Sequence, residues 1–428
     1  MNHDRYDIIV IGAGPAGLIA AIESFVPSRK ILILEKMPRP ALKLRISGKG
    51  RCNITNAANI NDFLSHFGKN GRFLRSAFHE FFTTDLLQYF EELGVQFKLE
   101  RGGRYFPQSD DAMEIVDALL NKINHLHIPL LTNHEIIRLT ISPSPPAPAA
   151  EFTVTIHQKS VGTNTPHRSV TLRAGKIVLA TGGKSYPKTG SNGTGFTLAS
   201  QLGHAITPLS PSLVPLVTGG DTAKKLQGLS LRNVNVSVWR HGKKIAEQFG
   251  EMIFTHFGVS GPVILSLSHK VVQCLDQKRQ VSLSIDLKPA LDHNMLDRRL
   301  LREIHNRRKQ HVKALLQQLL PKTMIAVFLE KLNIAPEKPL SELRAEERKH
   351  LRMLLKEFRL DIIGYRSFDE AIITSGGVCV QEIHPQTMES KIVKGLFFAG
   401  EIIDIDADTG GFNLQAAFST GWLAGRSL

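Results

Sequence analysis

The sequence of 428 residues predicts an α/β fold that is interrupted by an inserted β-domain and a helical subdomain. Apolar runs that end in glycine turns and lead into helical patterns occur at residues 6–17, 176–202 and 396–425. This order of strand, turn and helix is typical of parallel βα units. Between the second and third units the chain changes to short β-rich segments and then to charged helices. We therefore expect a Rossmann-like domain that is built from both ends of the chain.

The first βα unit carries a dinucleotide-binding fingerprint. Its apolar run is followed by Gly12, Gly14 and Gly17, and a second apolar run ends at Glu35 and Lys36. The first glycine permits a tight turn, the second lets the backbone approach a pyrophosphate, and the third lets helix and strand pack closely. The pyrophosphate then lies at the helix N-terminus. Glu35 follows Gly17 by 18 residues, close to the spacing of a carboxylate that binds an adenosine ribose.

The segment after this unit alternates between helical and strand patterns. A basic, glycine-rich loop at 37–56 precedes helices at 77–93 and 112–126, with a strand at 96–100 between them. Three further strands are predicted at 135–140, 151–157 and 169–180, and the Pro- and Ala-rich connection at 142–150 reads as a hairpin tip. A second glycine turn, Thr181-Gly182-Gly183, then faces the same edge of the sheet as the first turn.

The remainder of the chain divides into three parts. Strands are predicted at 214–217, 234–239, 251–255 and 281–287, and a charged helical region at 296–357 is broken by three prolines. Apolar strands and glycine turns resume after residue 368, and a helix of small residues closes the chain. We expect four segments: an FAD-binding domain at 1–206, an inserted β-domain at 207–288, a helical subdomain at 289–357, and the return of the FAD-binding domain at 358–428.

FAD explains this organisation better than a bound nicotinamide does. Only one complete dinucleotide fingerprint exists, yet glycine turns from both chain ends converge on one crevice. The N-terminal unit would hold the ADP half, while the C-terminal Gly400-Glu401 turn and the Gly410-Gly411 helix start would approach the ribityl chain and the ring. A helix N-terminus near the pyrimidine edge favours an anionic reduced flavin. NAD(P)H is expected only as a transient electron donor.

Five segments carry a resemblance to a known family. Residues 46–56, 103–107, 180–187, 254–262 and 395–415 resemble the bacterial NAD(P)/FAD-dependent oxidoreductases, a family of predicted flavoproteins that is called aminoacetone oxidase-like and includes a dehydro-bile-acid reductase. The resemblance implies an FAD-binding domain with a β-barrel-like insert and a helical piece, but no particular substrate. Two departures are Lys49, where a glycine or small polar residue is expected, and Asp406-Ala407-Asp408, where an Asp-Gly pair is more usual.

The predicted cofactor-binding residues come from the fingerprint, the basic loop, the second glycine turn and the C-terminal turns. For Ala16, Glu35, Lys36, Ser47, Glu401, Asn413 and Leu414 the contact is implied by the resemblance. The full set is Gly12, Gly14, Pro15, Ala16, Gly17, Glu35, Lys36, Ser47, Gly48, Gly50, Arg51, Cys52, Asn53, Thr181, Gly182, Gly183, Gly400, Glu401, Gly411, Asn413 and Leu414. No metal site is predicted, because the histidines show no ligand spacing.

Three residues are candidates for catalysis, and each has a plainer interpretation. His256 is a candidate general acid or a hydrogen-bonded structural histidine. Cys52 is a candidate reactive thiol, although a buried inert cysteine is the commoner case. Arg104 is a candidate anion binder. Arg51 suits either the flavin pyrophosphate, which we favour, or a substrate carboxylate, and Tyr186 suits packing against the ring.

Composition restricts the compartment and the partners. Three cysteines with no Cys-x-x-Cys pair fit a reduced compartment, and no apolar run reaches the about 18 residues of a membrane span, so a soluble cytoplasmic protein is predicted. The formal charge of +14 favours anionic partners. The main interpretation is a flavin oxidoreductase acting on a small organic substrate. A flavin-dependent RNA-modifying enzyme, suggested by basic residues at 298–313, and a non-catalytic flavin-bound regulator are the alternatives.

Overall fold

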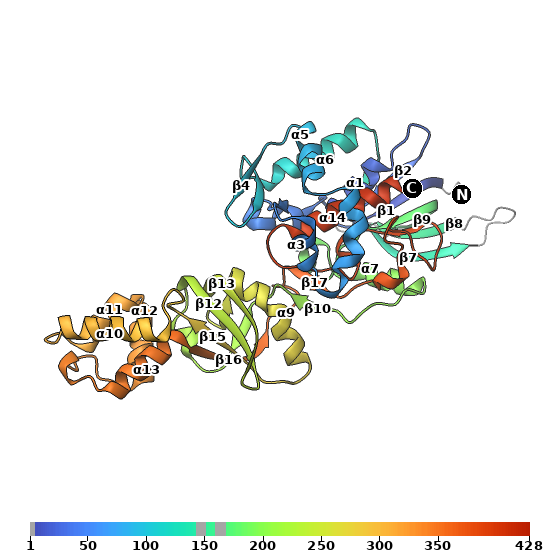
Figure 1. Ribbon diagram of the computed structural model, residues 1–428. Helices are drawn as coiled ribbons and strands as arrows, with labels where there is room; N and C mark the ends of the chain where they lie inside the picture. The colour runs from blue at the N-terminus through green and yellow to red at the C-terminus, as the bar shows by residue number, and fades with distance from the viewer. Residues whose placement is uncertain (1–4, 143–150, 159–167) are drawn as a thin grey trace. The chain divides into compact units, whose positions relative to one another are not determined.

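The computed structural model describes residues 5–142, 151–158 and 168–428, so the predicted hairpin tip lies almost entirely outside the described residues. The chain forms two compact units (Figure 1). Unit 1 consists of Met1–Pro211 and Ala371–Leu428, and unit 2 consists of Ser212–Glu370. The chain passes from unit 1 to unit 2 at β10 (Ser210–Ser212) and re-enters unit 1 just before β17 (Ile373–Ser375).

Unit 1 is built on a seven-stranded sheet in the order β6-β2-β1-β9-β8-β7, with β18 also paired to β9. The pairs of β1 with β2, β1 with β9, β2 with β6 and β18 with β9 are parallel. The pairs of β8 with β7 and β9 are antiparallel. The strands are β1 (Arg5–Ile11), β2 (Ile31–Leu34), β6 (Leu130–Leu131), β7 (His134–Ser142), β8 (Glu151–Gln158), β9 (Arg168–Leu179) and β18 (Leu396–Phe398).

The first and last helices of the chain pack against each other in unit 1. α1 (Pro15–Glu23) and α14 (Phe412–Arg426) cross where α14 has glycines. A Cβ at Gly421 would lie 2.3 Å from the carbonyl oxygen of Ala16, and a Cβ at Gly425 would lie 2.6 Å from that of Ala20. Small residues therefore allow the two backbones to touch. This contact brings the C-terminus back to the N-terminal βα unit, in agreement with the predicted fold class.

Smaller elements complete unit 1. The predicted helix at 77–93 is two helices, because the chain is extended at Phe81 and the backbone N–H of Phe82 donates to the Asp85 side chain at the start of the second helix. The elements are α2 (Leu42–Arg45), α3 (Ile60–Ser65), α4 (Arg75–Glu80), α5 (Thr83–Glu92), α6 (Ala112–His125), α7 (Thr194–Gln201), the short 3-10 helices η1 (Ser47–Gly50), η2 (Gly68–Leu74), η3 (Pro187–Thr189), η5 (Val380–Glu382) and η6 (Gly400–Ile402), and a sheet of β3 (Thr55–Asn56), β5 (Arg104–Pro107) and β4 (Phe97–Glu100).

Unit 2 contains a closed six-stranded barrel in the order β11-β14-β13-β12-β15-β16. Alternate residues of β12, Val234, Val236 and Val238, are buried in its interior, and Phe254 and Phe358 add aromatic side chains to the same core. Packing of this kind lets a small barrel close around side chains alone. The strands are β11 (Leu216–Thr218), β12 (Ser230–Arg240), β13 (Lys243–Phe254), β14 (Gly258–Ser260), β15 (Val281–Asp286) and β16 (Phe358–Tyr365).

Helices make up the rest of unit 2. A 15-residue helix between β14 and β15, which the sequence analysis does not predict, buries Val263, Ile264 and Val271 in the barrel core. The helices are α8 (Thr222–Lys225), α9 (Pro262–Asp276), α10 (His293–Asn306), α11 (Val312–Leu319), α12 (Lys322–Leu332) and α13 (Ala345–Lys356), with η4 (Leu340–Glu342). Within the described part of the chain, no helix combines the length and the apolar character that crossing a membrane requires.

The return of the chain to unit 1 falls later than the sequence indicates. Residues 358–365 form β16, which pairs with β15 and β11 and so closes the barrel. The change of unit therefore occurs at Ala371 and not at residue 358, and the departure occurs at Ser212 and not at residue 207. An apolar strand can belong to either sheet, and only its pairing partners decide which.

A buried histidine links α7 to the segment that precedes β18. His204 Nδ1 lies 3.1 Å from a carboxylate oxygen of Glu382, and its Nε2 lies 2.9 Å from the hydroxyl of Ser390. The side chain of His204 is fully buried. Burial lowers the pKa of His204 below the usual 6.5, an effect that outweighs the favourable charge of Glu382.

We expect this histidine to make unit 1 sensitive to mild acid. Below the usual pKa of 6.5, His204 is protonated in the unfolded chain but not in the folded chain. The free energy of unfolding therefore decreases as the pH is lowered. The slope from this one group is at most about 1.4 kcal/mol per pH unit. Urea denaturation of the wild type and of His204→Gln at about pH 7.5 and about pH 5.5 tests this. Equal losses of stability in both proteins would show that another group is responsible.

Candidate cofactor site

The three glycines of the β1–α1 turn have different surroundings. A Cβ at Gly12, where φ is +104°, would lie 2.4 Å from the carbonyl oxygen of Ala180, and a Cβ at Gly17 would lie 1.9 Å from that of Gly12. At Gly14, by contrast, no heavy atom of the described residues lies within 4 Å of an added Cβ, apart from the chain neighbours. The fold itself requires Gly12 and Gly17. Gly14 faces open space at the N-terminus of α1, where an anion is favoured.

Glu35 ties the end of β2 to this turn. Its carboxylate accepts hydrogen bonds from the backbone N–H groups of Ala13 at 2.9 Å and Met37 at 2.8 Å. Burial raises the pKa of Glu35, and these two hydrogen bonds oppose that shift. A carboxylate has about four acceptor positions, so Glu35 can still accept a hydrogen bond from a ribose hydroxyl. Lys36 follows, and its ammonium donates to Asn192 at 2.5 Å.

The loop at 47–53 has an unusual backbone. φ is positive at Gly48 (+57°), Lys49 (+62°), Gly50 (+86°) and Cys52 (+58°). This explains why a glycine is expected at Lys49, because a left-handed conformation is least strained without a Cβ. The side-chain oxygen of Asn53 is buried and has no hydrogen-bond partner among the described residues. Leaving such an atom unpaired costs roughly 1–3 kcal/mol, so a bound ligand is its natural partner.

Arg51 is engaged by protein carboxylates. Its Nε donates to Asp110 at 2.7 Å, a second nitrogen pairs with Glu100, and the guanidinium lies 4.2 Å from the centre of the Phe106 ring. The hydrogen bonds from Arg51 lower the pKa of Glu100, and those from Lys98 and Arg51 lower the pKa of Asp110. The guanidinium connects the basic loop to β4 and to the turn after β5. Its contact with a phosphate or a substrate carboxylate stays a prediction.

Cys52 is fully buried, and burial raises the pKa of its thiol to about 12. A hydrogen bond with Ser47 opposes this shift only in part. The thiolate is the nucleophile, so full burial and a raised pKa disfavour that role for this thiol. Burial supports the packing alternative for Cys52, and its role stays a prediction. Its neighbour Arg51 does not lower the thiol pKa, since the guanidinium faces away toward Glu100.

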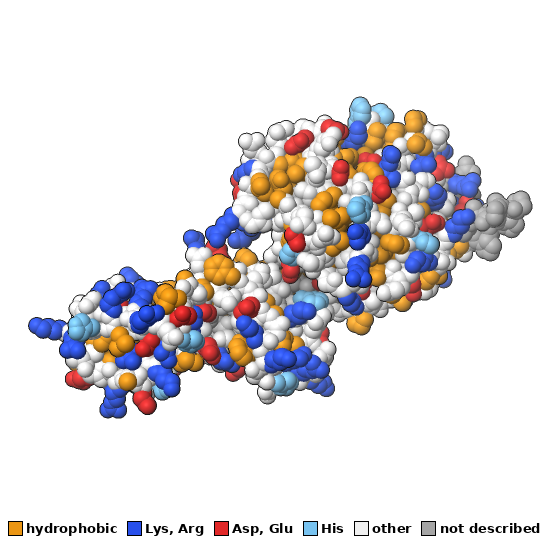
Figure 2. Space-filling view, viewed as in Figure 1, with side chains coloured by type: hydrophobic (Ala, Val, Ile, Leu, Met, Phe, Trp, Pro, Cys, Tyr) orange, Lys and Arg blue, Asp and Glu red, His pale blue; other side chains and the backbone are white. Residues whose placement is uncertain are grey.

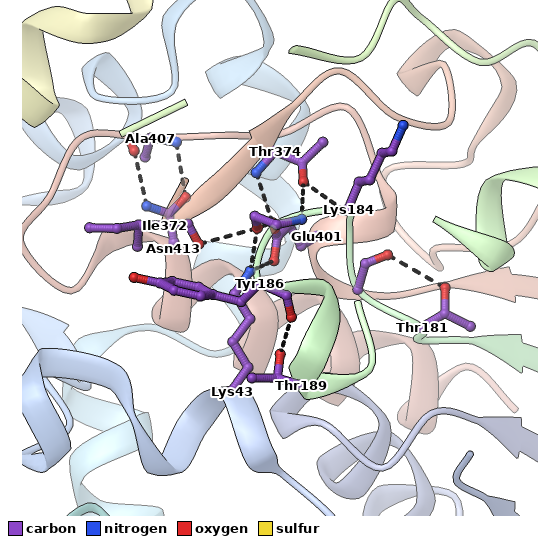
Figure 3. Close-up of polar contacts among 12 residues, drawn as sticks. Lys43, Thr181, Lys184, Tyr186, Thr189, Ile372, Thr374, Glu401, Ala407 and Asn413 are labelled. Carbon is purple, nitrogen blue, oxygen red and sulfur yellow. Dashed lines mark hydrogen bonds and ion pairs between the residues drawn. The ribbon is translucent and has the colours of Figure 1, made fainter. Parts of the chain in front are cut away.

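A network of side chains joins the second glycine turn to Glu401 (Figure 3). Lys43 donates to the carboxylate of Glu401 at 2.6 Å and to the hydroxyl of Ser185 at 2.7 Å. The other oxygen of Glu401 accepts from Ser185 at 2.9 Å and from the backbone N–H of Thr374 at 2.8 Å. Lys43 and Glu401 are 24% and 19% exposed, so the ion pair is largely shielded from water. It connects α2, the turn after β9, β17 and η6.

Glycines allow these segments to approach. A Cβ at Gly183 would lie 2.5 Å from the hydroxyl of Thr374, and a Cβ at Gly400, where φ is +77°, would lie 2.9 Å from the Cβ of Ala16. A Cβ at Gly182, where φ is +71°, would lie 2.8 Å from the hydroxyl oxygen of Ser191. The turn with Thr181 and the turn with Glu401 are therefore held together and against the start of α1. This part of the site depends on contacts within the chain, whether or not a ligand is bound.

The N-terminus of α14 is fixed in a similar way. A Cβ at Gly411 would lie 2.4 Å from the carbonyl oxygen of Thr55. The Asn413 amide donates to the carbonyl of Ala407 at 2.9 Å and accepts from its N–H at 2.9 Å (Figure 3). Asn413 thus shapes the Asp406-Ala407-Asp408 loop, while Leu414 packs against the core of unit 1. The side chain of Asn413 is occupied within the protein.

Of the remaining candidates, Arg104 lies in unit 1 and His256 in unit 2. Arg104 is exposed, and its Nε donates to the carbonyl of Arg101 at 3.0 Å, which leaves other N–H groups available to an anion. His256 is exposed in the turn between β13 and β14 and contacts the ring of Phe257. Tyr186 has φ of +51° and lies next to Ser185 in the turn. The roles of these three residues stay predictions.

Two groups of polar residues at the site are missing from the sequence analysis. Lys43, Ser185 and Thr374 form the network around Glu401, and no sequence spacing links them, because Lys43 and Glu401 are 358 positions apart. His66 Nδ1 lies 2.9 Å from the Asp408 carboxylate, and its ring stacks on Phe412 at the start of α14. A histidine after a short amphipathic helix gives no signal of such a contact.

The arrangement fits a flavin dinucleotide. The unfilled space at Gly14, the free acceptor positions of Glu35 and the unpartnered oxygen of Asn53 lie in segments that the sequence assigns to the same cofactor. The space at Gly14 can take a phosphate, Glu35 can bind a ribose, and the Asn53 oxygen can accept from a hydrogen-bond donor. The closely packed glycines at 183, 400 and 411 contribute a rigid backbone around them.

Comparison with known proteins gives one family and several full-length relatives. The model of the family described as HI0933-like protein Rossmann domain matches residues 6–427. The chain is 29% identical over 420 residues to a 3-dehydro-bile acid delta(4,6)-reductase of Clostridium scindens, covering 98% of each chain. It is also 29% identical over 426 residues to a ribosomal RNA dihydrouridine synthase of Escherichia coli, covering 99% of this chain and 98% of that one.

A similar fold occurs among solved structures. The 3-ketosteroid delta1-dehydrogenase from Sterolibacterium denitrificans superimposes with a TM-score of 0.53 over 99% of each chain, at 12% sequence identity. At this identity the likeness concerns the fold alone. It agrees with the predicted Rossmann-like domain with inserted parts.

We expect Gly14→Val to fold normally and to lose the cofactor. The position has φ of −83° and open space around it, so valine fits the protein but fills the volume at the helix N-terminus. The purified variant should absorb about tenfold less near 450 nm than the wild type, and its melting curve should match that of wild-type protein from which the flavin has been removed.

Gly17→Val is the matched comparison for this experiment, because the fold requires that glycine. It should reduce soluble yield and thermal stability, whatever the flavin content. A yellow Gly14→Val protein with normal flavin affinity would mean that no phosphate lies at this turn.

We expect Lys43 and Glu401 to be coupled in stability. Either Lys43→Met or Glu401→Gln leaves one member of a shielded ion pair alone, whereas the double variant removes both charges. The coupling free energy from a double-mutant cycle in chemical denaturation should be about 1–3 kcal/mol. A coupling near zero, with additive losses, would indicate that the pair is solvated and not structural.

Proposed function

The chain belongs to the family described as HI0933-like protein Rossmann domain, and from this premise we propose that it is an FAD-dependent reductase of a carbon–carbon double bond conjugated to a carbonyl group. One observation carries the choice of bond. Two full-length relatives with different named substrates are named for the same type of change. A delta(4,6)-reductase of a 3-dehydro bile acid reduces double bonds, and dihydrouridine is uridine with two hydrogens added across a ring double bond beside a carbonyl.

The residues around the β1–α1 turn would hold the FAD. The space at Gly14 and the N-terminus of α1 suit the pyrophosphate, and Glu35 suits the adenosine ribose. Ser47, Asn53 and the turns at 181–183 and 400–401 would surround the remainder, with the start of α14 toward the ring. Bound flavin supplies reversible two-electron transfer. NAD(P)H is proposed as the electron donor, binding transiently, because the chain has one dinucleotide fingerprint.

The protein itself must deliver a proton. Reduction of a conjugated double bond adds a hydride to the carbon β to the carbonyl and a proton to the α carbon. His66 Nε2 is a candidate donor, since Nδ1 is paired with the Asp408 carboxylate and the ring stacks on Phe412, the first residue of α14. The exposed His256 is the donor that the sequence suggests, and Arg104 is proposed to hold an anionic group of the substrate.

A second candidate substrate is a uracil base within RNA. The specific observation in its favour is charge, because 53 Lys and Arg residues stand against 39 Asp and Glu. A net positive protein attracts a polyanion such as RNA more strongly than a bile acid, which carries a single carboxylate. The non-catalytic regulator is the weaker interpretation, since the full-length relatives are named as enzymes.

We expect the reduced enzyme to be reoxidised by conjugated substrates only. The protein would be reduced anaerobically with NADPH or NADH, and then mixed with a 3-keto-Δ4 steroid, a uridine-containing RNA, a saturated ketone or an amine. A conjugated substrate should restore the visible flavin spectrum and gain two hydrogens by mass spectrometry. The saturated ketone and the amine should leave the spectrum bleached, because neither offers a polarised double bond.

The choice of electron donor is read in the first step of the same experiment. Failure of both nicotinamides with success of dithionite would remove NAD(P)H from the proposal and leave the reductase in place. Turnover of the amine, with the steroid and the RNA both inert, would overturn the proposed reaction. The Gly14→Val protein serves as the cofactor-free control.

A further inference from the structure

The helical part of unit 2 carries an excess of positive charge. Residues 293–357 contain 15 Lys and Arg against 8 Asp and Glu. Figure 2 shows basic side chains gathered over the end of unit 2 that these helices form. Five of them lie on α10, on the turn after it and at the start of α11, and we name them the α10–α11 basic face: Arg298, Arg302, Arg308, Lys309 and Lys313.

These five side chains are exposed, and none forms an ion pair with a residue that the structure describes. Two other basic residues of the same stretch do not belong to the face. Arg299 is half-buried, and Arg307 donates to Glu303 at 3.1 Å. The structure thus separates charges with a structural role from charges that remain available.

The acidic residues of α10 form ion pairs with arginines that do not belong to the basic face. Asp297 pairs with Arg348 at 3.2 Å and with Arg352 at 3.4 Å, both on α13. Glu303, the one acidic residue within 298–313, is taken by Arg307. The two carboxylates within residues 297–313 are therefore both paired with arginines outside the basic face. The positive potential of the face extends into solvent, where an anion can reduce it.

The face is also held rigidly. α10 buries Leu296 and Leu300 in the core of unit 2. Arg298 and Arg302 lie one turn apart on the opposite side of the helix, because residues at i and i+4 share a side. Val312, Leu315 and Leu316 anchor α11 in the same core. Charges on packed helices keep their spacing better than charges on a loop.

We infer that the α10–α11 basic face is a docking surface for the phosphate backbone of a folded RNA. The inference rests on the RNA candidate of the proposed function. Arginine recognises phosphate in a bidentate manner, and three of the five residues are arginine. Residues 293–313 contain no Phe, Tyr or Trp, so the face offers no platform for base stacking. It would therefore bind RNA through phosphates, with little preference for sequence.

The test compares two triple variants of the full-length flavoprotein. Arg298→Glu, Arg302→Glu and Lys309→Glu reverse three charges of the face. Arg232→Glu, Lys243→Glu and Arg279→Glu reverse three exposed charges on other parts of unit 2 and change the net charge equally. Binding of a fluorescein-labelled RNA hairpin would be followed by anisotropy over a range of salt concentrations, with visible absorbance as a check on flavin content.

The face variant should bind the hairpin at least about tenfold more weakly than the wild type. The slope of log affinity against log salt concentration should decrease in magnitude by about two to three. The control variant should lose no more than about threefold. Equal losses in both variants would show that only net charge matters and would overturn the inference. Binding of polyglutamate as tight as that of RNA, with the same loss in the face variant, would indicate an acidic protein partner and would also overturn it.

Failure of this inference differs from failure of the proposed reaction. If reduced enzyme turns over an RNA or a steroid while the face variant binds RNA normally, the reaction stands and the surface is wrong. If the face variant alone loses RNA binding while no conjugated substrate is reduced, the surface stands and the reaction is wrong. The binding assay uses the oxidised protein, so it does not depend on turnover.

Discussion

The candidate cofactor site depends on the direct contact of backbones where β1, α1, β9 and α14 meet. Gly12 and Gly17 have no room for a side chain against Ala180 and against each other, and Gly421 meets Ala16 on α1 in the same way. Each contact fixes the position of one segment with respect to the next. Gly14 is the exception, since nothing in the chain occupies the volume beside it. Contacts within the fold account for Gly12 and Gly17 but not for Gly14, the position proposed for the pyrophosphate.

Local patterns in the sequence predicted the elements of unit 1 well. β1, β2 and α14 follow from apolar runs and glycine turns that need no knowledge of distant residues. The barrel was predicted less completely, because pairing decides it. The first half of β13 carries the charged residues Lys243, Lys244 and Glu247, so its sequence lacks the apolar alternation of a strand. The sequence of β16 predicts a strand, but only its pairing with β15 assigns it to the barrel. The break between α4 and α5 depends on the hydrogen bond between Asp85 and Phe82.

In the candidate site too, features within one short segment could be predicted, whereas contacts between segments far apart in the sequence could not. Its glycine turns and Glu35 were found because their spacing is short and fixed. The network of Lys43, Ser185 and Glu401 was not, since its members come from three distant segments that only the folded sheet brings together. Arg51 and Cys52 were identified as chemically interesting by residue type. The sequence does not contain the carboxylate partners of Arg51 or the burial of Cys52, which favour an anchoring role for the first and a packing role for the second.

The crossing of α1 and α14 also constrains how the protein is made. Unit 2 is one continuous stretch of chain, whereas the core of unit 1 needs the last helix to leave the ribosome. During translation the surface of α1 that packs on α14 stays uncovered until α14 has been synthesised, while the barrel already has all its strands. Folding of the inserted unit therefore precedes completion of the domain that surrounds it in sequence, and the nascent N-terminal sheet must be protected from aggregation during that interval.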